Sequence, residues 1–260
     1  MYNGAVFFDY DGTLADEANK IFLPTESTRR TISKLKEQGF AIFLATGRSK
    51  CYIPDLPGLF DGYVAANGAY TELDGKTISS TDIDSGTVEN LINEFEKLNL
   101  EFSFENQESL FVRNVNSETF IAMLNTFDIP INIMKPLYEK TNVCKGIVLF
   151  NSDEEFAELK ERFHGTVIFD RHRTYNSADV TIPGVNKGVG VKNVIEKLNI
   201  PYENTFAFGD GTNDVEMIKA VCHGVAMGEC VPSAREAAEY VTDTVINEGI
   251  TKAFEHYKLI

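Results

Sequence analysis

Short apolar runs alternate with helical patterns through both ends of the chain. The first run, Ala5 to Phe8, precedes a predicted helix from Glu26 to Gln38, in which Ile32 and Leu35 share a face. Continuous apolar runs are typical of strands buried on both faces of a parallel sheet. The other strands predicted here are Phe40–Ala45, Tyr63–Ala66, Thr205–Phe208 and His223–Ala226, and the other helices are Lys187–Leu198, Asn213–Val221 and Pro232–Tyr240. We therefore expect an α/β fold with a Rossmann-like parallel-sheet core and helices on both faces.

The middle of the chain has a different pattern, in which alternating strands and helices are mixed. Its predicted helices are Ser85–Leu98, Ser117–Phe127 and Asp153–Phe163, and its predicted strands are Glu101–Glu105, Leu110–Asn114, Lys145–Phe150, Thr166–Asp170 and Asp179–Ile182. Hairpins mixed with helices indicate an α+β domain rather than more parallel sheet. We therefore predict a core made of residues 1–81 and 184–260, interrupted by an inserted α+β domain of residues 82–183.

The amino-acid composition disfavours some classes of binding partner. The chain has 24 Lys and Arg against 39 Asp and Glu, a net charge of −15, which disfavours nucleic acid and anionic membranes as partners. The run from Phe40 to Ala45 is far too short to span a membrane, and the first residues lack the basic region of a signal peptide. The four cysteines are widely separated. We therefore expect a cytoplasmic protein with reduced thiols and a small-molecule partner.

Two carboxylates stand two residues apart where the first apolar run ends. Asp9 and Asp11 belong to the string D-Y-D-G-T, and ligands of open α/β sheets bind at the carboxyl ends of the strands. Neighbouring carboxylates repel each other unless a cation relieves them, and oxygen ligands of this kind suit Mg²⁺. A solvated turn is the alternative for an isolated Asp-Gly pair, but the full string behind a buried strand favours a metal site.

A second acidic cluster follows the predicted strand that ends at Phe208. Asp210 stands at the strand tip, and Asp214 follows one helical turn later. An ordinary helix N-terminus, capped by Asp, Thr or Asn, explains this pattern equally well when it is considered alone. Its place at a second strand tip of the same predicted sheet favours a joint acidic site with Asp9.

Two weaker signals supply groups that bind phosphate. Thr46-Gly47-Arg48 follows a predicted strand, where a hydroxyl and backbone N–H groups can hold a phosphate oxygen, although a plain turn explains it too. Lys187 begins a predicted helix, which is the unfavourable end of the helix dipole for a cation. A surface lysine is the simpler explanation, whereas a lysine that faces carboxylates and a phosphate would also account for this position.

The order of these four clusters resembles the haloacid dehalogenase (HAD) superfamily of phosphotransferases. Asp9 to Thr13 match its first motif, Thr46 its second, Lys187 its third, and Gly209 to Asp214 its fourth. The large insert is similar to the α+β cap (type IIB) of the Cof-like phosphatase subgroup, as is Asn67-Gly68-Ala69. One departure is Gly211, where many members carry serine.

The resemblance implies a phosphatase that depends on Mg²⁺, hydrolyses small phosphorylated metabolites and forms an aspartyl-phosphate. Asp9 would be the nucleophile and Asp11 the general acid and base. The implied metal ligands are Asp9, Asp11 through its backbone carbonyl, and Asp210, with Asp214 holding the metal shell or orienting Lys187. The implied phosphate ligands are Thr46, Gly47, Lys187 and Asn213.

Substrate choice is expected to lie in the inserted domain. Its densest basic stretch is Asp170-Arg171-His172-Arg173, which could contact a polar or anionic substrate, although a solvated hairpin loop is an equally good explanation. Arg48 and Arg113 are further candidates.

Other functions remain open at this point. A phosphomutase would pass the phosphoryl group from the aspartate to a sugar hydroxyl, and the type of cap allows this. A receiver-like switch also clusters aspartates around Mg²⁺, but it has no large insert and no use for Asp11. A catalytically inactive sensor of sugar phosphates would not need to keep Asp11 either.

Overall fold

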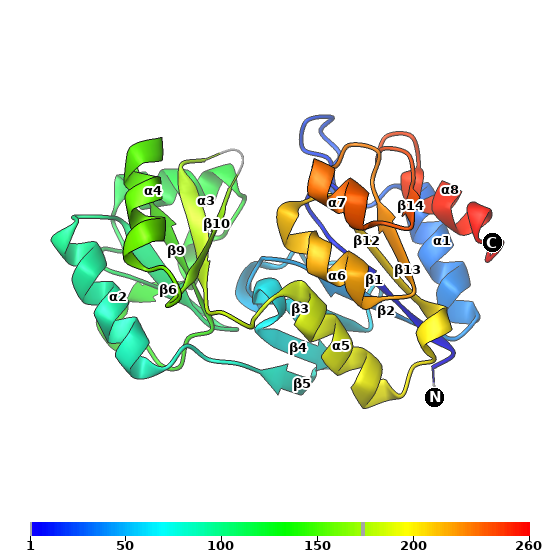
Figure 1. The fold of residues 1–260 in the computed structure, drawn as a ribbon, viewed down its shortest axis with the longest axis horizontal. Coiled ribbons are helices and arrows are strands. Elements are labelled where there is room, and N and C mark those ends of the chain that lie inside the picture. The colour runs from blue at the N-terminus through cyan, green and yellow to red at the C-terminus, as the bar shows by residue number, and fades with distance from the viewer. Residues whose placement is uncertain (1, 173–174) are drawn as a thin grey trace. The chain divides into compact units, whose positions relative to one another are not determined.

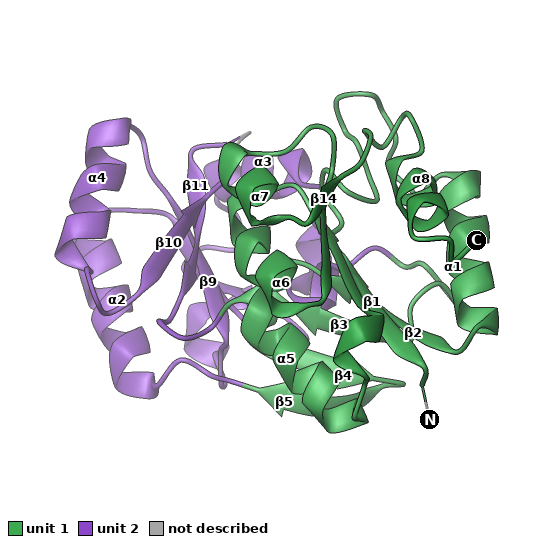
Figure 2. Ribbon diagram, turned by 45° about the vertical axis from the view of Figure 1, so that its right-hand side comes forward, with its two compact units in different colours: residues 1–47, 55–80, 186–260 green, residues 48–54, 81–185 purple. Residues whose placement is uncertain are grey.

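The computed structural model describes residues 2–172 and 175–260, and the chain divides into two units (Figure 2). Unit 1 consists of Met1–Gly47, Asp55–Ser80 and Asn186–Ile260. Unit 2 consists of Arg48–Pro54 and Thr81–Val185. Within the described residues, no helix combines the length and apolar character needed to cross a membrane.

Unit 1 is built on a mostly parallel sheet with the strand order β14-β13-β12-β1-β2-β3-β4-β5. The strands from β14 to β3 are parallel, and β4 and β5 extend the sheet as an antiparallel hairpin. The strands are β1 (Gly4–Phe8), β2 (Phe40–Ala45), β3 (Gly62–Ala65), β4 (Tyr70–Leu73), β5 (Lys76–Ser80), β12 (Thr205–Gly209), β13 (His223–Ala226) and β14 (Tyr240–Val241). In β1 and β2 every residue is buried, as continuous apolar strands require.

Helices cover both faces of this sheet (Figure 1). Helices α5, α6 and α7 lie on one face, and α1 and α8 lie on the other. Their bounds are α1 (Glu26–Glu37), α5 (Lys187–Leu198), α6 (Val215–Ala220), α7 (Pro232–Ala237) and α8 (Gly249–His256). Helix α1 buries Ile32 and Leu35, the face predicted from the sequence. The predicted α/β class, with a parallel-sheet core covered on both faces, is therefore confirmed.

Two of the predicted helices are shorter than the sequence suggested. The helix expected from Asn213 begins instead with a 3₁₀ turn (Thr212–Asp214), and α6 follows it and ends at Ala220. The helix expected to reach Tyr240 ends at Ala237, because Tyr240 and Val241 pair with β13 as an edge strand. The further 3₁₀ turns are Lys50–Tyr52, Ala66–Gly68, Ile131–Ile133, Leu137–Glu139 and Tyr202–Asn204.

Unit 2 is an α+β domain, as predicted for the insert. Its sheet has the order β10-β11-β9-β6-β7-β8. Its strands are β6 (Phe102–Glu105), β7 (Leu110–Val112), β8 (Met134–Pro136), β9 (Lys145–Leu149), β10 (Ile168–Arg171) and β11 (Ser177–Thr181), and its helices are α2 (Ser85–Lys97), α3 (Glu118–Thr126) and α4 (Asp153–Arg162). Alternate strand residues pack in two apolar clusters, one with α2 and α4 and the other with α3.

The segment Arg48–Pro54 was expected within the core, but its contacts place it in unit 2. Tyr52 is buried there and donates a hydrogen bond from its hydroxyl to Glu105 Oε2 at 2.8 Å. Lys145 Nζ donates to the same tyrosine oxygen at 2.9 Å. An unpredicted buried ionic cluster therefore holds this segment against the unit 2 sheet.

Candidate active site

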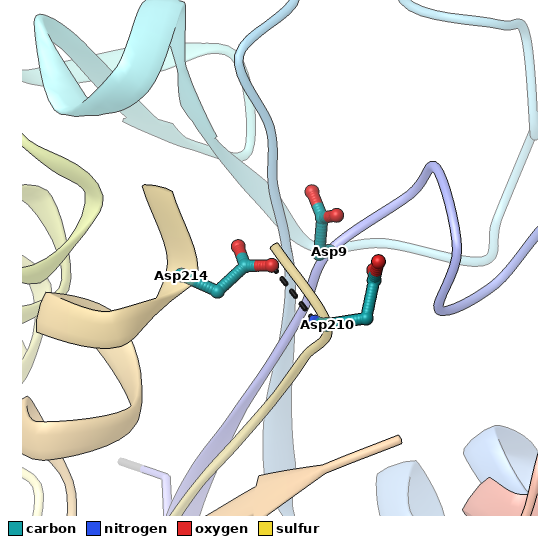
Figure 3. Close-up of side chains that lie close together, drawn as sticks. All are labelled: Asp9, Asp210 and Asp214. Carbon is teal, nitrogen blue, oxygen red and sulfur yellow. Dashed lines mark hydrogen bonds between the residues drawn. The ribbon is translucent and has the colours of Figure 1, made fainter. Parts of the chain in front are cut away.

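Asp9 and Asp210 meet because their strands are parallel neighbours. Phe8 of β1 pairs with Phe208 of β12, and the Asp9 N–H donates to the Phe208 carbonyl at 2.9 Å. Each aspartate follows its strand and is almost fully buried. With Asp214 they form a cluster in which one carboxylate oxygen from each residue lies within 4.8 Å of the others (Figure 3). The carboxylates at the two strand tips therefore lie together in the fold.

Asp214 organises the loop that carries Asp210. Its Oδ2 accepts a hydrogen bond from the backbone N–H of Asp210 at 2.9 Å (Figure 3). The same oxygen accepts from the backbone N–H of Gly211 at 2.8 Å. Its Oδ1 accepts from Lys187 Nζ at 2.6 Å. One carboxylate thus fixes both the strand tip and the lysine of the site.

Lys187 contacts two members of the acidic cluster, Asp9 and Asp214. It begins α5, its side chain is fully buried, and its Nζ lies 2.6 Å from Asp9 Oδ1. Burial alone would lower the pKa of Lys187, but Asp214 and Asp9 outweigh this effect and raise the pKa above the usual range. The two carboxylates therefore keep the ammonium charged despite its position at a helix N-terminus.

The cluster has the character of a cation site. Burial, together with the charges of Asp214, Asp210 and Asp11, raises the pKa of Asp9 well above its usual range, although Lys187 opposes this. The single charge of Lys187 offsets only one of the clustered carboxylates, and each of these carboxylates offers oxygen donors. A hard divalent cation such as Mg²⁺ fits this donor set, and it would favour the ionised form of Asp9.

The loop after Asp9 is shaped by Gly12. This residue has a φ of +92°, and a Cβ atom there would overlap the Asp210 carboxylate. Thr13 Oγ1 contacts Asp210 Oδ1 at 3.3 Å. Asp11, between these positions and Asp9, has an exposed side chain. The D-x-D-G-T string therefore places one buried and one accessible carboxylate beside each other in sequence.

Thr46 follows β2, the strand beside β1, and is buried. Its N–H donates to the Val64 carbonyl at 2.8 Å, and its own carbonyl accepts from the Asn67 N–H at 3.1 Å. Asn67 Oδ1 in turn accepts from Asn213 Nδ2 at 3.0 Å. Sequence analysis gave Asn67 no role in the site, although its Asn-Gly pair marked an unusual turn.

The basic candidates of unit 2 have partners within that unit. Arg48 Nη1 donates to the Phe127 carbonyl at 3.2 Å, and Arg113 faces Glu101 at 3.9 Å. Arg171 Nη1 pairs with Asp153 at 2.6 Å. His172 contacts Ser177 Oγ at 2.7 Å through Nδ1 and Asp179 Oδ1 at 3.1 Å through Nε2. Arg173 lies outside the described residues.

Known proteins resemble this chain in sequence. The family model of haloacid dehalogenase-like hydrolases matches residues 6–254. The chain is 30% identical to YkrA of Bacillus subtilis, a candidate phosphatase, over the full length of both chains. It is 25% identical to 5-amino-6-(5-phospho-D-ribitylamino)uracil phosphatase YcsE of the same organism, covering 98% of this chain and 95% of that one.

A solved structure extends the comparison to three dimensions. The HAD subclass IIB sugar phosphatase BT4131 superimposes with a TM-score of 0.86 at 30% identity, covering 99% of this chain and 100% of that chain. The resemblance inferred from the motifs is therefore confirmed. The chain belongs to the haloacid dehalogenase-like hydrolase family, in its Cof-like branch, and is a HAD-type phosphoric monoester hydrolase.

Proposed function

We propose that this enzyme hydrolyses the phosphate ester of a small phosphorylated metabolite, such as a sugar phosphate, with Mg²⁺ and through an aspartyl-phosphate on Asp9. The observation that carries the proposal is the buried cluster of Asp9, Asp210 and Asp214, with Lys187 Nζ at 2.6 Å from both Asp9 and Asp214. A nucleophilic carboxylate, an acidic cation site and a fixed positive charge are what phosphoryl transfer requires of a protein.

In the first step an oxygen of Asp9 forms a bond to phosphorus while the bond from phosphorus to the ester oxygen breaks. Asp11 donates a proton to that leaving oxygen, so the product departs as an alcohol. Its exposed side chain supports this role, since a general acid must reach the substrate. Lys187 neutralises charge on the phosphoryl oxygens, helped by Thr46, Gly47 and Asn213.

In the second step Asp11, now ionised, accepts a proton from water as the water oxygen attacks phosphorus. The bond from phosphorus to Asp9 breaks, which releases inorganic phosphate and restores both carboxyl groups to their starting states.

Asp9, Asp210 and the Asp11 carbonyl would hold the cation, and Asp214 would fix the surrounding loop. The bound cation supplies positive charge that screens Asp9 from the approaching phosphate.

Metal removal tests the proposed chemistry. Phosphate release from a panel of phosphorylated metabolites and p-nitrophenyl phosphate should fall roughly 100-fold or more with EDTA and return with added MgCl₂. The wild type assayed without EDTA is the reference for each compound. Equal release with and without EDTA would contradict the cation site, whereas hexose-phosphate isomerisation that requires a bisphosphate would support the mutase alternative.

We further propose that unit 2 selects the substrate. It contains a cavity of about 720 Å³ whose lining includes Arg171, His172, Tyr175 and Asn176. This lining is mostly polar, with cationic, hydroxyl and amide groups that suit a hydroxylated or anionic substrate. Arg48, Arg113 and Arg173 remain weaker candidates for the same role.

Replacing Arg171 with alanine should separate recognition from chemistry. For the best metabolite substrate we expect kcat/KM to fall about tenfold, since one charged hydrogen bond is lost. For p-nitrophenyl phosphate, whose leaving group has no hydroxyl to recognise, we expect little change. Arg162→Ala is the matched control, because Arg162 pairs with Glu94 at 2.8 Å in the same unit without lining the cavity. Equal losses on both substrates would argue against a role in recognition.

A further inference from the structure

Three consecutive residues of unit 1 adopt left-handed backbone conformations. They are Ala66, Asn67 and Gly68, with φ angles of +51°, +52° and +92°. They form the 3₁₀ turn between β3 and β4, and all three are buried. A left-handed alanine is uncommon and costs conformational free energy, so packing around the turn must impose this conformation.

The turn contacts separate parts of the site. The Asn67 N–H donates to the Thr46 carbonyl at 3.1 Å, and Asn67 Oδ1 accepts from Asn213 Nδ2 at 3.0 Å. A Cβ atom on Gly68 would overlap the Asn186 carbonyl, immediately before Lys187. Parts of the chain that follow β2, precede α5 and follow β12 therefore converge on this short turn.

We propose that Asn67 is a positioning residue that aims the Asn213 amide at the phosphoryl group. This inference rests on the proposed function, in which Asn213 binds that group. The Asn67 oxygen occupies one N–H of the Asn213 amide and so fixes the rotation of its plane. The rest of that amide is then held in one direction as substrate arrives.

With its left-handed backbone, Asn67 contacts both Thr46 and Asn213. The same residue donates from its backbone to the Thr46 carbonyl and accepts through its side chain from Asn213. The turn thus couples the position of the phosphate-binding threonine to the direction of the asparagine amide. Asparagine suits the place because it tolerates a positive φ and carries an acceptor oxygen.

A double-mutant cycle tests the inference. Asn67→Gly keeps the left-handed turn and removes the acceptor, and Asn213→Ala removes the group that Asn67 would act through. Asn199→Gly is the matched control, because Asn199 has a φ of +51° at the exposed end of α5. Circular dichroism and thermal unfolding check the fold of each variant. Asn67→Ala also removes the acceptor, in a turn that already holds the left-handed Ala66, and runs the same cycle should Asn67→Gly not fold.

We expect Asn67→Gly to lower kcat/KM for p-nitrophenyl phosphate about tenfold in the wild-type background and less than about twofold in Asn213→Ala. The Asn199→Gly control should stay within about twofold of the wild type. For Asn67→Ala, the effects in the two backgrounds should differ by at least about threefold. Equal effects of the Asn67 substitution in both backgrounds, or no effect in the wild type, would overturn the inference.

A second readout separates this inference from the proposed function. If the wild type hydrolyses nothing in the panel, the proposed function fails. The rise in Tm caused by inorganic phosphate with MgCl₂ then reports on phosphate binding in the same set of variants. We expect Asn67→Gly to shrink that rise in the wild-type background only. An unchanged rise would overturn the positioning role.

Discussion

Asp9→Asn is expected to lower kcat roughly 10⁴-fold or more while leaving the fold intact. The amide has nearly the shape of the carboxylate but cannot attack phosphorus, and the Lys187 ammonium 2.6 Å away loses a charged partner. Lys187 keeps Asp214 at 2.6 Å, so its burial remains compensated. Steady-state hydrolysis of p-nitrophenyl phosphate, with circular dichroism as a check on folding, measures this effect.

Asp61→Asn provides a comparison for that experiment. Asp61 pairs with Lys36 at 2.9 Å in the same unit but is not part of the acidic cluster. We expect its kcat to stay within about twofold of the wild type. Asp61 lies outside the acidic cluster, and a partly exposed ion pair contributes little to stability. If Asp9→Asn retained a substantial fraction of the wild-type kcat, a covalent role for Asp9 would be rejected.

Lys145→Met is expected to lower the free energy of unfolding by about 3–5 kcal/mol, because it removes one partner of a buried ion pair and leaves the other charge uncompensated. Lys145 Nζ lies 2.8 Å from Asp179 Oδ1 and 3.6 Å from Glu105 Oε1, and all three side chains are buried. Methionine fills a similar volume but removes the ammonium that both buried carboxylates face. Urea denaturation at pH 7, followed by circular dichroism, measures the change.

Lys97→Met is the control for the stability measurement. Lys97 pairs with Glu94 on the surface of the same unit, so its removal should cost less than about 1 kcal/mol. A loss for Lys145→Met no larger than that of Lys97→Met would show that the buried cluster adds no stability.

The same cluster predicts a dependence on pH. Burial alone would raise the pKa of Asp179, but Lys145 and His172 outweigh burial and lower that pKa below its usual value near 4. A depressed carboxyl pKa stabilises the fold above about pH 4 and loses this contribution as the pH falls. The stability advantage of the wild type over Lys145→Met should therefore shrink as the pH drops below about 4.

The proximity of Asp9 and Asp210 was predictable because both follow buried apolar strands. Asp9, Thr46 and Asp210 each come directly after one of three neighbouring parallel strands, so they lie at the same edge of the sheet. Lys187 was predictable only in combination with them, since a lysine at a helix N-terminus is common on protein surfaces.

Other features could not be predicted from the sequence, because their signals are local and ambiguous. The hairpin of β4 and β5 contains few apolar residues, although Asp74-Gly75 marks its turn. The sequence pattern makes Lys145 and Glu105 ordinary ends of strands, because alternation alone does not show that charges from β6, β9 and β11 meet in the interior. Asn67 lacked a role because its partner Asn213 lies 146 positions further along the chain.

The assignment of Arg48–Pro54 to unit 2 limits how this enzyme can be divided into fragments. A fragment of residues 81–185 would lack Tyr52, whose hydroxyl lies between Glu105 and Lys145 in the interior of that unit. The missing phenol would leave buried polar groups without one of their partners. Domain exchange among relatives therefore needs a graft of two pieces, in which the short stretch after Gly47 travels with the insert. Each unit of this enzyme is assembled from separate stretches of the chain, so a unit cannot be exchanged as one continuous segment.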